Sequence, residues 1–241
     1  MQLCLGGVQF GLPYGVFSQR QAEPHAVKDI LTYAEAKKIL FIDTSCAYGS
    51  SEQVLGESAD MGSFKVITKT PTYTKKKSSL SDAQFLQDTF LRSLLRLKRE
   101  SIYGLLVHSA DDLLTPGAEY LFDQMLQLKQ DGKVSKLGVS VYTPEQLDKI
   151  MQKFPIEIVQ LPLNILDQRF LQTGMLRHLA KAGIEVHARS LFLQGMLLHS
   201  SSELPKYFSD FIQIYQRYEK YCQENNLTQL EACLNFVSSI S

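Results

Sequence analysis

Phe41-Ile42-Asp43-Thr44-Ser45-Cys46-Ala47-Tyr48-Gly49 is the stretch from which the fold can be worked out. It begins as a short apolar run of strand length, reaches a carboxylate, and continues into a polar turn. Similar runs recur along the chain with amphipathic helical stretches between them, which is the pattern of βα units around a parallel sheet. We therefore predict seven strands, at residues 2–6, 39–43, 65–69, 102–108, 136–140, 156–160 and 184–188.

Capping signals mark the starts of two of the intervening helices. In Thr143-Pro144-Glu145-Gln146 the hydroxyl can cap the helix, proline suits the first turn, and the glutamine can reach back to the cap amide. The stretch from Ser81 to Gln84 has the same spacing and predicts a second start. Each signal precedes an apolar stripe of helical period, so we expect these helices to pack on the sheet.

The composition narrows the class of protein and its partners. With 241 residues and 44% apolar side chains the chain can bury a full core, so we expect one domain over residues 1–241. Lysine plus arginine and aspartate plus glutamate both total 25, so no overall field favours nucleic acid or an anionic membrane. No run approaches the ~20 apolar residues that a membrane helix needs.

The cysteines and the first residues indicate a cytoplasmic protein. Cys4, Cys46, Cys222 and Cys233 show neither a CxxC pair nor the Cys/His spacing of a metal site. The opening residues lack the basic segment and long apolar run of a secretion signal. We therefore expect reduced thiols and a cytoplasmic location.

Three of the predicted strands end on an ionisable residue, at Asp43, Lys69 and His108. A parallel barrel gathers the carboxyl ends of its strands at one mouth, so these side chains are expected to converge there. Taken singly, a histidine in such a place is more often structural, and a lysine more often reaches solvent. Together they indicate a site, because Asp43 would neutralise a buried ammonium on Lys69.

Tyr48 follows Asp43 closely, and Gly49 can turn the chain so that the phenol points back over the mouth. A nearby ammonium favours the ionised form of a phenol, which makes Tyr48 a candidate general acid. The alternative is a loop tyrosine whose ring packs on Leu55.

The order of several segments resembles the aldo-keto reductases from the first predicted strand onward. The most specific segment is DTSCAYGSSEQVLG at residues 43–56, with its spacing to Lys69 and His108. The others are LGGVQFG (5–11), VITKT (66–70), LLVHS (105–109), GKVSKLGVSVY (132–142), EIVQLPLNILDQR (157–169) and VHARSLFLQGML (186–197). The resemblance implies an α/β fold of the (β/α)8 TIM-barrel type, here incomplete with about seven βα units.

The resemblance also implies a reaction, the NADPH-dependent reduction of an aldehyde or ketone by hydride transfer to the carbonyl carbon. In that scheme Tyr48 protonates the developing alkoxide, and Asp43 and Lys69 tune the phenol. His108 orients and polarises the oxygen of the small carbonyl substrate.

A second set of positions matches those that hold the cofactor in the family. Ser140 and Gln160 match positions that hold the nicotinamide carboxamide, and Ser190 and Gln194 fall in the loop that wraps the pyrophosphate. Asp43 and Arg189 complete the set. Two departures stand out. Val141 replaces a common asparagine, and Arg189 stands where an aromatic ring usually stacks on the nicotinamide, although a guanidinium plane can also stack.

The carboxyl end departs further from the resemblance. In the family an eighth strand and a segment that binds the adenosine 2′-phosphate follow the helix predicted after Leu227, and the chain given stops at Ser241. We therefore expect a C-terminally truncated barrel with unpaired edges on its first and last strands, closed either by a longer chain or by a homodimer. The residues identify neither the carbonyl substrate nor the preference for NADPH over NADH.

Two functions stay open at this point, and a third is rejected. The first is a carbonyl reductase; the second is a weak or inactive barrel of the same kind that acts in cofactor sensing or protein assembly. A metal-dependent hydrolase would need clustered ligands, and the histidines form no ligand-like pair at His25, His108, His178, His187 and His199. We expect no metal.

Overall fold

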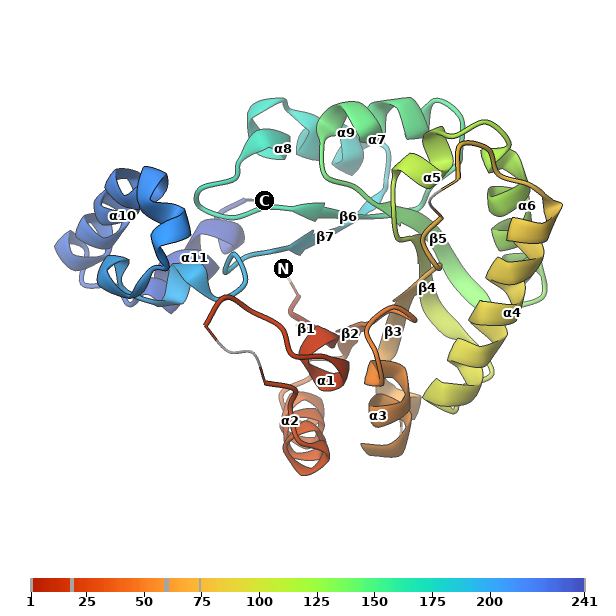
Figure 1. The fold of residues 1–241 in the computed structure, drawn as a ribbon, viewed down its shortest axis with the longest axis horizontal. Coiled ribbons are helices and arrows are strands. Elements are labelled where there is room, and N and C mark those ends of the chain that lie inside the picture. The colour runs from red at the N-terminus through yellow and green to blue at the C-terminus, as the bar shows by residue number, and fades with distance from the viewer. Residues whose placement is uncertain (1, 18–19, 59–60, 74, 241) are drawn as a thin grey trace.

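The computed structural model describes residues 2–17, 20–58, 61–73 and 75–240, arranged as Figure 1 shows. Seven parallel strands form one sheet in the order β1-β2-β3-β4-β5-β6-β7. They are β1 Cys4–Gly6, β2 Phe41–Asp43, β3 Lys65–Lys69, β4 Ile102–Val107, β5 Val134–Ser140, β6 Ile158–Pro162 and β7 Glu185–Arg189. The sheet curls with helices around its outside, so the predicted fold class, an incomplete (β/α)8 barrel, is confirmed.

Helices connect the strands and cover the outer face of the sheet (Figure 1). The α-helices are α1 Val8–Gly11, α2 Pro24–Ala36, α3 Ser51–Ser58, α4 Leu80–Leu97, α5 Asp111–Leu114, α6 Ala118–Gln130, α7 Pro144–Met151, α8 Arg169–Gln172, α9 Met175–Lys181, α10 Ile212–Glu224 and α11 Gln229–Ser238. The 3-10 helices are η1 Met61–Ser63, η2 Met196–Leu198, η3 Ser201–Glu203 and η4 Lys206–Phe211. Among the residues described here, no helix has the length and apolar character to cross a membrane.

All seven predicted strands are present, but several of their ends lie elsewhere. The first begins at Cys4 instead of residue 2, and the sixth runs to Pro162 instead of residue 160. Pairing explains the second shift, because Pro162 lies opposite Arg189 in the parallel register of β6 with β7. A strand ends where its neighbour stops pairing, and that boundary cannot be predicted from the apolar run alone.

One of the two predicted helix starts is correct. At the start of α7, Thr143 Oγ1 accepts a hydrogen bond from the Gln146 amide at 3.2 Å, as expected. The prediction for residues 81–84 is wrong, because α4 is capped two residues earlier. There the Asp82 carboxylate accepts from the amide and hydroxyl of Ser79 at 3.0 and 2.6 Å, and a carboxylate in the first turn also suits the helix dipole.

Inside the barrel lies a belt of apolar side chains on four strands. Each belt residue precedes a polar residue of the mouth by two positions, and a spacing of two places both on the same face of a strand. The pairs are Phe41 with Asp43, Ile67 with Lys69, Leu106 with His108, and Ile158 with Gln160. The belt therefore forms a floor beneath the strand-end polar residues.

A separate apolar cluster holds α10 and α11 beside the loop that follows β7, at the left of Figure 1. Tyr215 and Tyr218 of α10 are buried in it. The Tyr215 hydroxyl donates to the His199 carbonyl oxygen at 2.7 Å, and the Tyr218 hydroxyl donates to the Leu197 carbonyl oxygen at 3.1 Å. These contacts fix the loop whose first residues border the candidate site.

Candidate active site

An ion pair between β2 and β3 lies at the centre of the site. Lys69 Nζ donates to Asp43 Oδ1 at 2.6 Å and to the Thr44 carbonyl oxygen at 2.9 Å. The Lys69 side chain is 1% exposed and that of Asp43 is 16% exposed. Burial opposes the charge on Lys69, but the Asp43 carboxylate, together with Tyr48, raises the pKa of the lysine above its usual value. The ammonium is therefore charged at neutral pH.

Tyr48 reaches the mouth through a turn that only glycine can make at its next position. Gly49 has φ +54°, and a Cβ there would lie 2.4 Å from the Gly11 carbonyl oxygen. The Tyr48 ring centroid is 4.9 Å from Lys69 Nζ and 5.8 Å from the His108 ring, which meets it edge-on. Leu55, the alternative partner considered above, is fully buried in the core between helices and sheet.

His108 completes the group and is held from two sides. Its Nδ1 lies 3.3 Å from Ser45 Oγ, and its backbone amide donates to Thr70 Oγ1 at 3.2 Å. Burial lowers the pKa of the imidazole to about 4, and the Lys69 ammonium adds to the shift. The ring is therefore neutral at pH 7. Ser45 was not predicted as a site residue, although it stands in the same polar turn as Tyr48.

Ser140 and Gln160 lie directly opposite each other in the register of β5 with β6. Both are buried, and Ser140 Oγ donates to Gln160 Oε1 at a long 3.4 Å. Gln160 Nε2 donates to Asp43 Oδ1 at 2.7 Å. Two of the predicted cofactor residues are thus connected to the Asp43–Lys69 pair, a link that the sequence did not predict.

Arg189 and the loop after it lie at the rim of the mouth. The guanidinium carbon is 4.3 Å from the centroid of the Tyr142 ring, and Nη2 donates to the Val141 carbonyl oxygen at 3.1 Å. Ser190 and Gln194 have φ values of 61° and 57°, which are uncommon for residues other than glycine. Strain of this kind is often found at ligand-binding loops.

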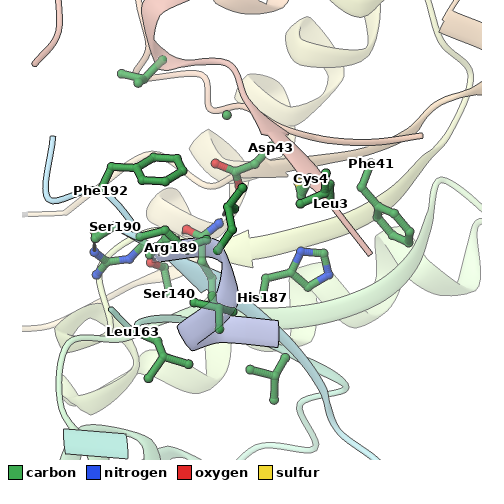
Figure 2. A pocket seen from close by; sticks show the side chains of 18 of the residues that line it. Leu3, Cys4, Phe41, Asp43, Ser140, Leu163, His187, Arg189, Ser190 and Phe192 are labelled. Carbon is green, nitrogen blue, oxygen red and sulfur yellow. Dashed lines mark hydrogen bonds between the residues drawn. The ribbon is translucent and has the colours of Figure 1, made fainter. Parts of the chain in front are cut away.

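A cavity of about 1260 Å³ joins these residues. Figure 2 shows Arg189, Ser190 and Phe192 on its left, Phe41 and His187 on its right, and Asp43 between them. Lys69 lies behind the wall, and the other predicted site residues line it: Asp43, Tyr48, His108, Ser140, Gln160, Arg189, Ser190 and Gln194. Aromatic residues that the sequence did not single out complete the rim: Tyr14, Phe17, Tyr142 and Phe192. In the described part of the chain, no group of three or more His, Cys, Asp or Glu side chains could hold a metal ion.

A comparison with protein families decides the assignment. The model of the Aldo/keto reductase family matches residues 2–239. This chain belongs to that family. Among curated relatives it is similar to the aldo-keto reductase YhdN of Bacillus subtilis, with 29% identity over 54% of this chain and 41% of the relative. It is also similar to the oxidoreductase YdhF of Escherichia coli, with 27% identity over 50% of this chain and 40% of the relative.

Solved structures agree on the fold of this aldo/keto reductase. The glycerol dehydrogenase AKR11B4 of Gluconobacter oxydans aligns with a TM-score of 0.73 and 23% identity, over 97% of this chain and 78% of that one. At this identity the likeness concerns the fold alone. The alignments with the two curated relatives take in about two-fifths of the length of each.

This aldo/keto reductase has a second polar cluster at the opposite end of the barrel, where the strands begin. Glu185 of β7 lies 2.6 Å from Lys136 Nζ and 2.6 Å from His187 Nε2, and it also accepts from the Tyr103 hydroxyl. Burial opposes ionisation of Glu185, but these partners lower its pKa to about 2. Both carboxylate oxygens are engaged, so this cluster is saturated by its own members.

Proposed function

We propose that this chain reduces an aldehyde or ketone to an alcohol, with NADPH as the hydride donor and Tyr48 as the general acid. The observation that carries the proposal is the meeting of Tyr48, Lys69 and His108 around the mouth of one cavity. Membership of the aldo/keto reductase family supports the reaction class. A tyrosine beside a buried ammonium suits proton donation to a developing alkoxide.

The lining of the cavity fits a nicotinamide cofactor. Ser140 and Gln160 offer a hydroxyl and an amide, which are the partners that a carboxamide needs. The planar guanidinium of Arg189 offers a flat face for an aromatic ring. The loop that contains the left-handed residues Ser190 and Gln194 lines the same cavity, which supports a role for it in holding the phosphates. When bound, the cofactor supplies the hydride that the carbonyl carbon receives.

The protein's own part in the reaction is the movement of one proton. As the carbonyl oxygen becomes negative, Tyr48 transfers its hydroxyl proton to that oxygen and is left as a phenolate. The Lys69 ammonium, held by Asp43, stabilises the phenolate until a proton from solvent restores it. The substrate thus gains one hydride and one proton, which together convert a carbonyl to an alcohol.

His108 contributes as a neutral hydrogen-bond donor. Its low pKa keeps the ring uncharged at pH 7. In the tautomer that this role requires, Nδ1 accepts from Ser45 Oγ, and the ring proton on Nε2 can donate to the carbonyl oxygen. That bond would orient the substrate toward Tyr48 and strengthen as charge develops.

A second function is favoured by one feature of the sheet. Within the described residues, β1 and β7 are the two ends of the strand order, and each leaves an outer edge without a hydrogen-bonded neighbour. An open edge is a template for pairing with another chain. The second function is therefore that of a barrel that binds cofactor weakly and acts in cofactor sensing or protein assembly. In that case a homodimer would close the gap between β1 and β7 by pairing along these edges. Sedimentation would separate a monomer from such a dimer.

The test of the main proposal is a titration of the chain with NADPH, followed by nicotinamide emission, with NADH in parallel. NADPH consumption is then measured with a panel of aldehydes and ketones. We expect weak but saturable binding of NADPH and slow consumption with at least one carbonyl, and the parallel titration shows which nucleotide binds more tightly. Binding without consumption would favour the sensing function, and a chain that binds neither nucleotide would contradict both.

A further inference from the structure

Gln160 makes a contact that crosses the inside of the barrel. It lies on β6, which β3, β4 and β5 separate from β2 in the sheet. Its Nε2 nevertheless donates to Asp43 Oδ1 at 2.7 Å, the same oxygen that accepts from Lys69 Nζ at 2.6 Å. One carboxylate oxygen is therefore held from two sides, by a cation on β3 and by an amide on β6.

The orientation of the Gln160 amide follows from this contact. An ionised carboxylate only accepts hydrogen bonds, so Nε2 must face Asp43 and Oε1 must face away from it. Oε1 has one contact with Ser140 Oγ, at 3.4 Å, which is longer than an ordinary O–H···O bond. Gln160 is buried but lines the cavity, so Oε1 is presented to a ligand as an acceptor for an N–H group.

We infer that Gln160 is a positioning residue for the proton transfer, because it couples what its Oε1 binds in the cavity to the Asp43–Lys69 pair through its Nε2. The inference rests on the proposed function. An N–H donor on Oε1, such as the primary amide of the cofactor, polarises the Gln160 amide and strengthens its donation to Asp43. Asp43 in turn sets where the Lys69 ammonium lies relative to the Tyr48 ring.

This role differs from that of a residue that only holds the cofactor. Ser140 supplies the contrast, because it faces the cavity and its hydroxyl donates to Gln160 Oε1 and not to Asp43. Loss of the Ser140 hydroxyl weakens cofactor binding under either view. Loss of the Gln160 amide changes the chemistry itself only if Gln160 acts through Asp43.

The deciding variant is Gln160→Glu. It places a second carboxylate at hydrogen-bond distance from Asp43 Oδ1, and two carboxylates so close share one proton, which raises an apparent pKa of the pair. We expect kcat at saturating NADPH to gain an ionisation absent from the parent. Activity stays near that of the parent while the pair holds the proton, and falls roughly 10- to 100-fold when the proton is lost, as misplacement of a catalytic group predicts.

Two further variants serve as controls for the Gln160→Glu result. Gln160→Met keeps the length of the side chain without its donor, and it should lower kcat at every pH in the range of the profile. Ser140→Ala should raise the Kd of NADPH without a new ionisation in the profile of kcat. Urea midpoints of all three verify folding, and if Gln160→Met fails to fold, the Gln160→Glu profile decides.

The outcomes separate this inference from the function on which it rests. Gln160 variants that raise only the Kd or KM of NADPH, with a kcat profile parallel to that of the parent, overturn the positioning role and leave the reductase intact. A parent chain that reduces no carbonyl overturns the proposed function and the positioning role together.

Discussion

The two ends of the barrel interior contain the same kinds of group in different arrangements. At the mouth, Asp43 pairs with Lys69, and Tyr48 and His108 face a cavity. At the opposite end, Glu185 is engaged by a lysine, a tyrosine and a histidine: Lys136, Tyr103 and His187. The apolar belt that contains Ile67 lies between them. A carboxylate, an ammonium, a phenol and an imidazole are therefore not enough to define a catalytic site.

What distinguishes the mouth is how its groups are engaged. Tyr103 and Glu185 line the same cavity as Tyr48, but the Tyr103 hydroxyl is bound to that carboxylate, whereas the Tyr48 ring lies beside the Lys69 ammonium and the His108 ring. Barrel enzymes place their chemistry at the carboxyl ends of strands, and the other end serves stability. The two clusters should therefore respond differently to matched substitutions.

The largest expected difference concerns the two lysines. Lys69→Met leaves the half-buried Asp43 carboxylate without its cation, and we expect a loss of about 3 kcal/mol in the free energy of unfolding, as for a broken buried pair. Lys136→Met removes a pair whose side chains are 33% and 23% exposed, and we expect about 0–1 kcal/mol. Urea unfolding at pH 7 measures both. Equal losses would remove the distinction between the ends.

The two ends should also respond to acid in different pH windows. Both His108 and Glu185 have folded-state pKa values below their usual ones, about 4 against 6.5 and about 2 against 4.5. In its own window each of these two groups holds more protons in the unfolded chain, so its contribution to stability falls as the pH falls. The contribution of His108 is lost between pH 6.5 and 4, and that of Glu185 between pH 4.5 and 2.

Variants identify the origin of each window. Urea midpoints should fall less steeply with decreasing pH than those of the parent, between pH 6.5 and 4 in His108→Gln and between pH 4.5 and 2 in Glu185→Gln. Some slope remains in each variant, because Asp112, whose pKa is raised to about 6, and other carboxyl groups also titrate there. A His108→Gln variant whose stability profile parallels that of the parent from pH 6.5 to 4 would show that the His108 ring is not buried as a neutral group.

An effect well below that of Lys69→Met is expected for Tyr103→Phe. The change removes one hydrogen bond to Glu185, which retains Lys136 and His187, so we expect a loss of about 1 kcal/mol in stability. Thermal or urea unfolding measures it. A loss far above this would mean that the Tyr103 phenol, rather than the Glu185 carboxylate, organises the second polar cluster.

The sequence predicted the strands and the meeting of Asp43, Lys69 and His108 because both follow from local patterns and barrel topology. Asp43 and Lys69 end neighbouring strands, and no detail of side-chain conformation is needed to bring them together. The Gln160 to Asp43 bond could not be predicted in this way. It depends on the width of the barrel and on the rotamer of one long side chain, neither of which is written in the spacing.

The limits at other positions have similar physical causes. The cap of α4 was predicted at Ser81, two residues late. Either Asp82 or Gln84 can reach back to a serine three residues before it, and only the structure shows that Asp82 bonds to Ser79. Arg189 and Tyr142 are far apart in the sequence, so no local pattern predicts that the guanidinium stacks on the Tyr142 ring.

The most direct test of the central claim compares carbonyl reduction by Tyr48→Phe and Tyr103→Phe at saturating NADPH, with the Kd of NADPH measured for each. We expect Tyr48→Phe to reduce the carbonyl ~10²–10⁴-fold more slowly than the parent, because the general acid is lost, with nearly unchanged NADPH affinity. Tyr103→Phe should keep the rate of the parent. Equal rates in the two variants would contradict the account and remove Tyr48 from the reaction.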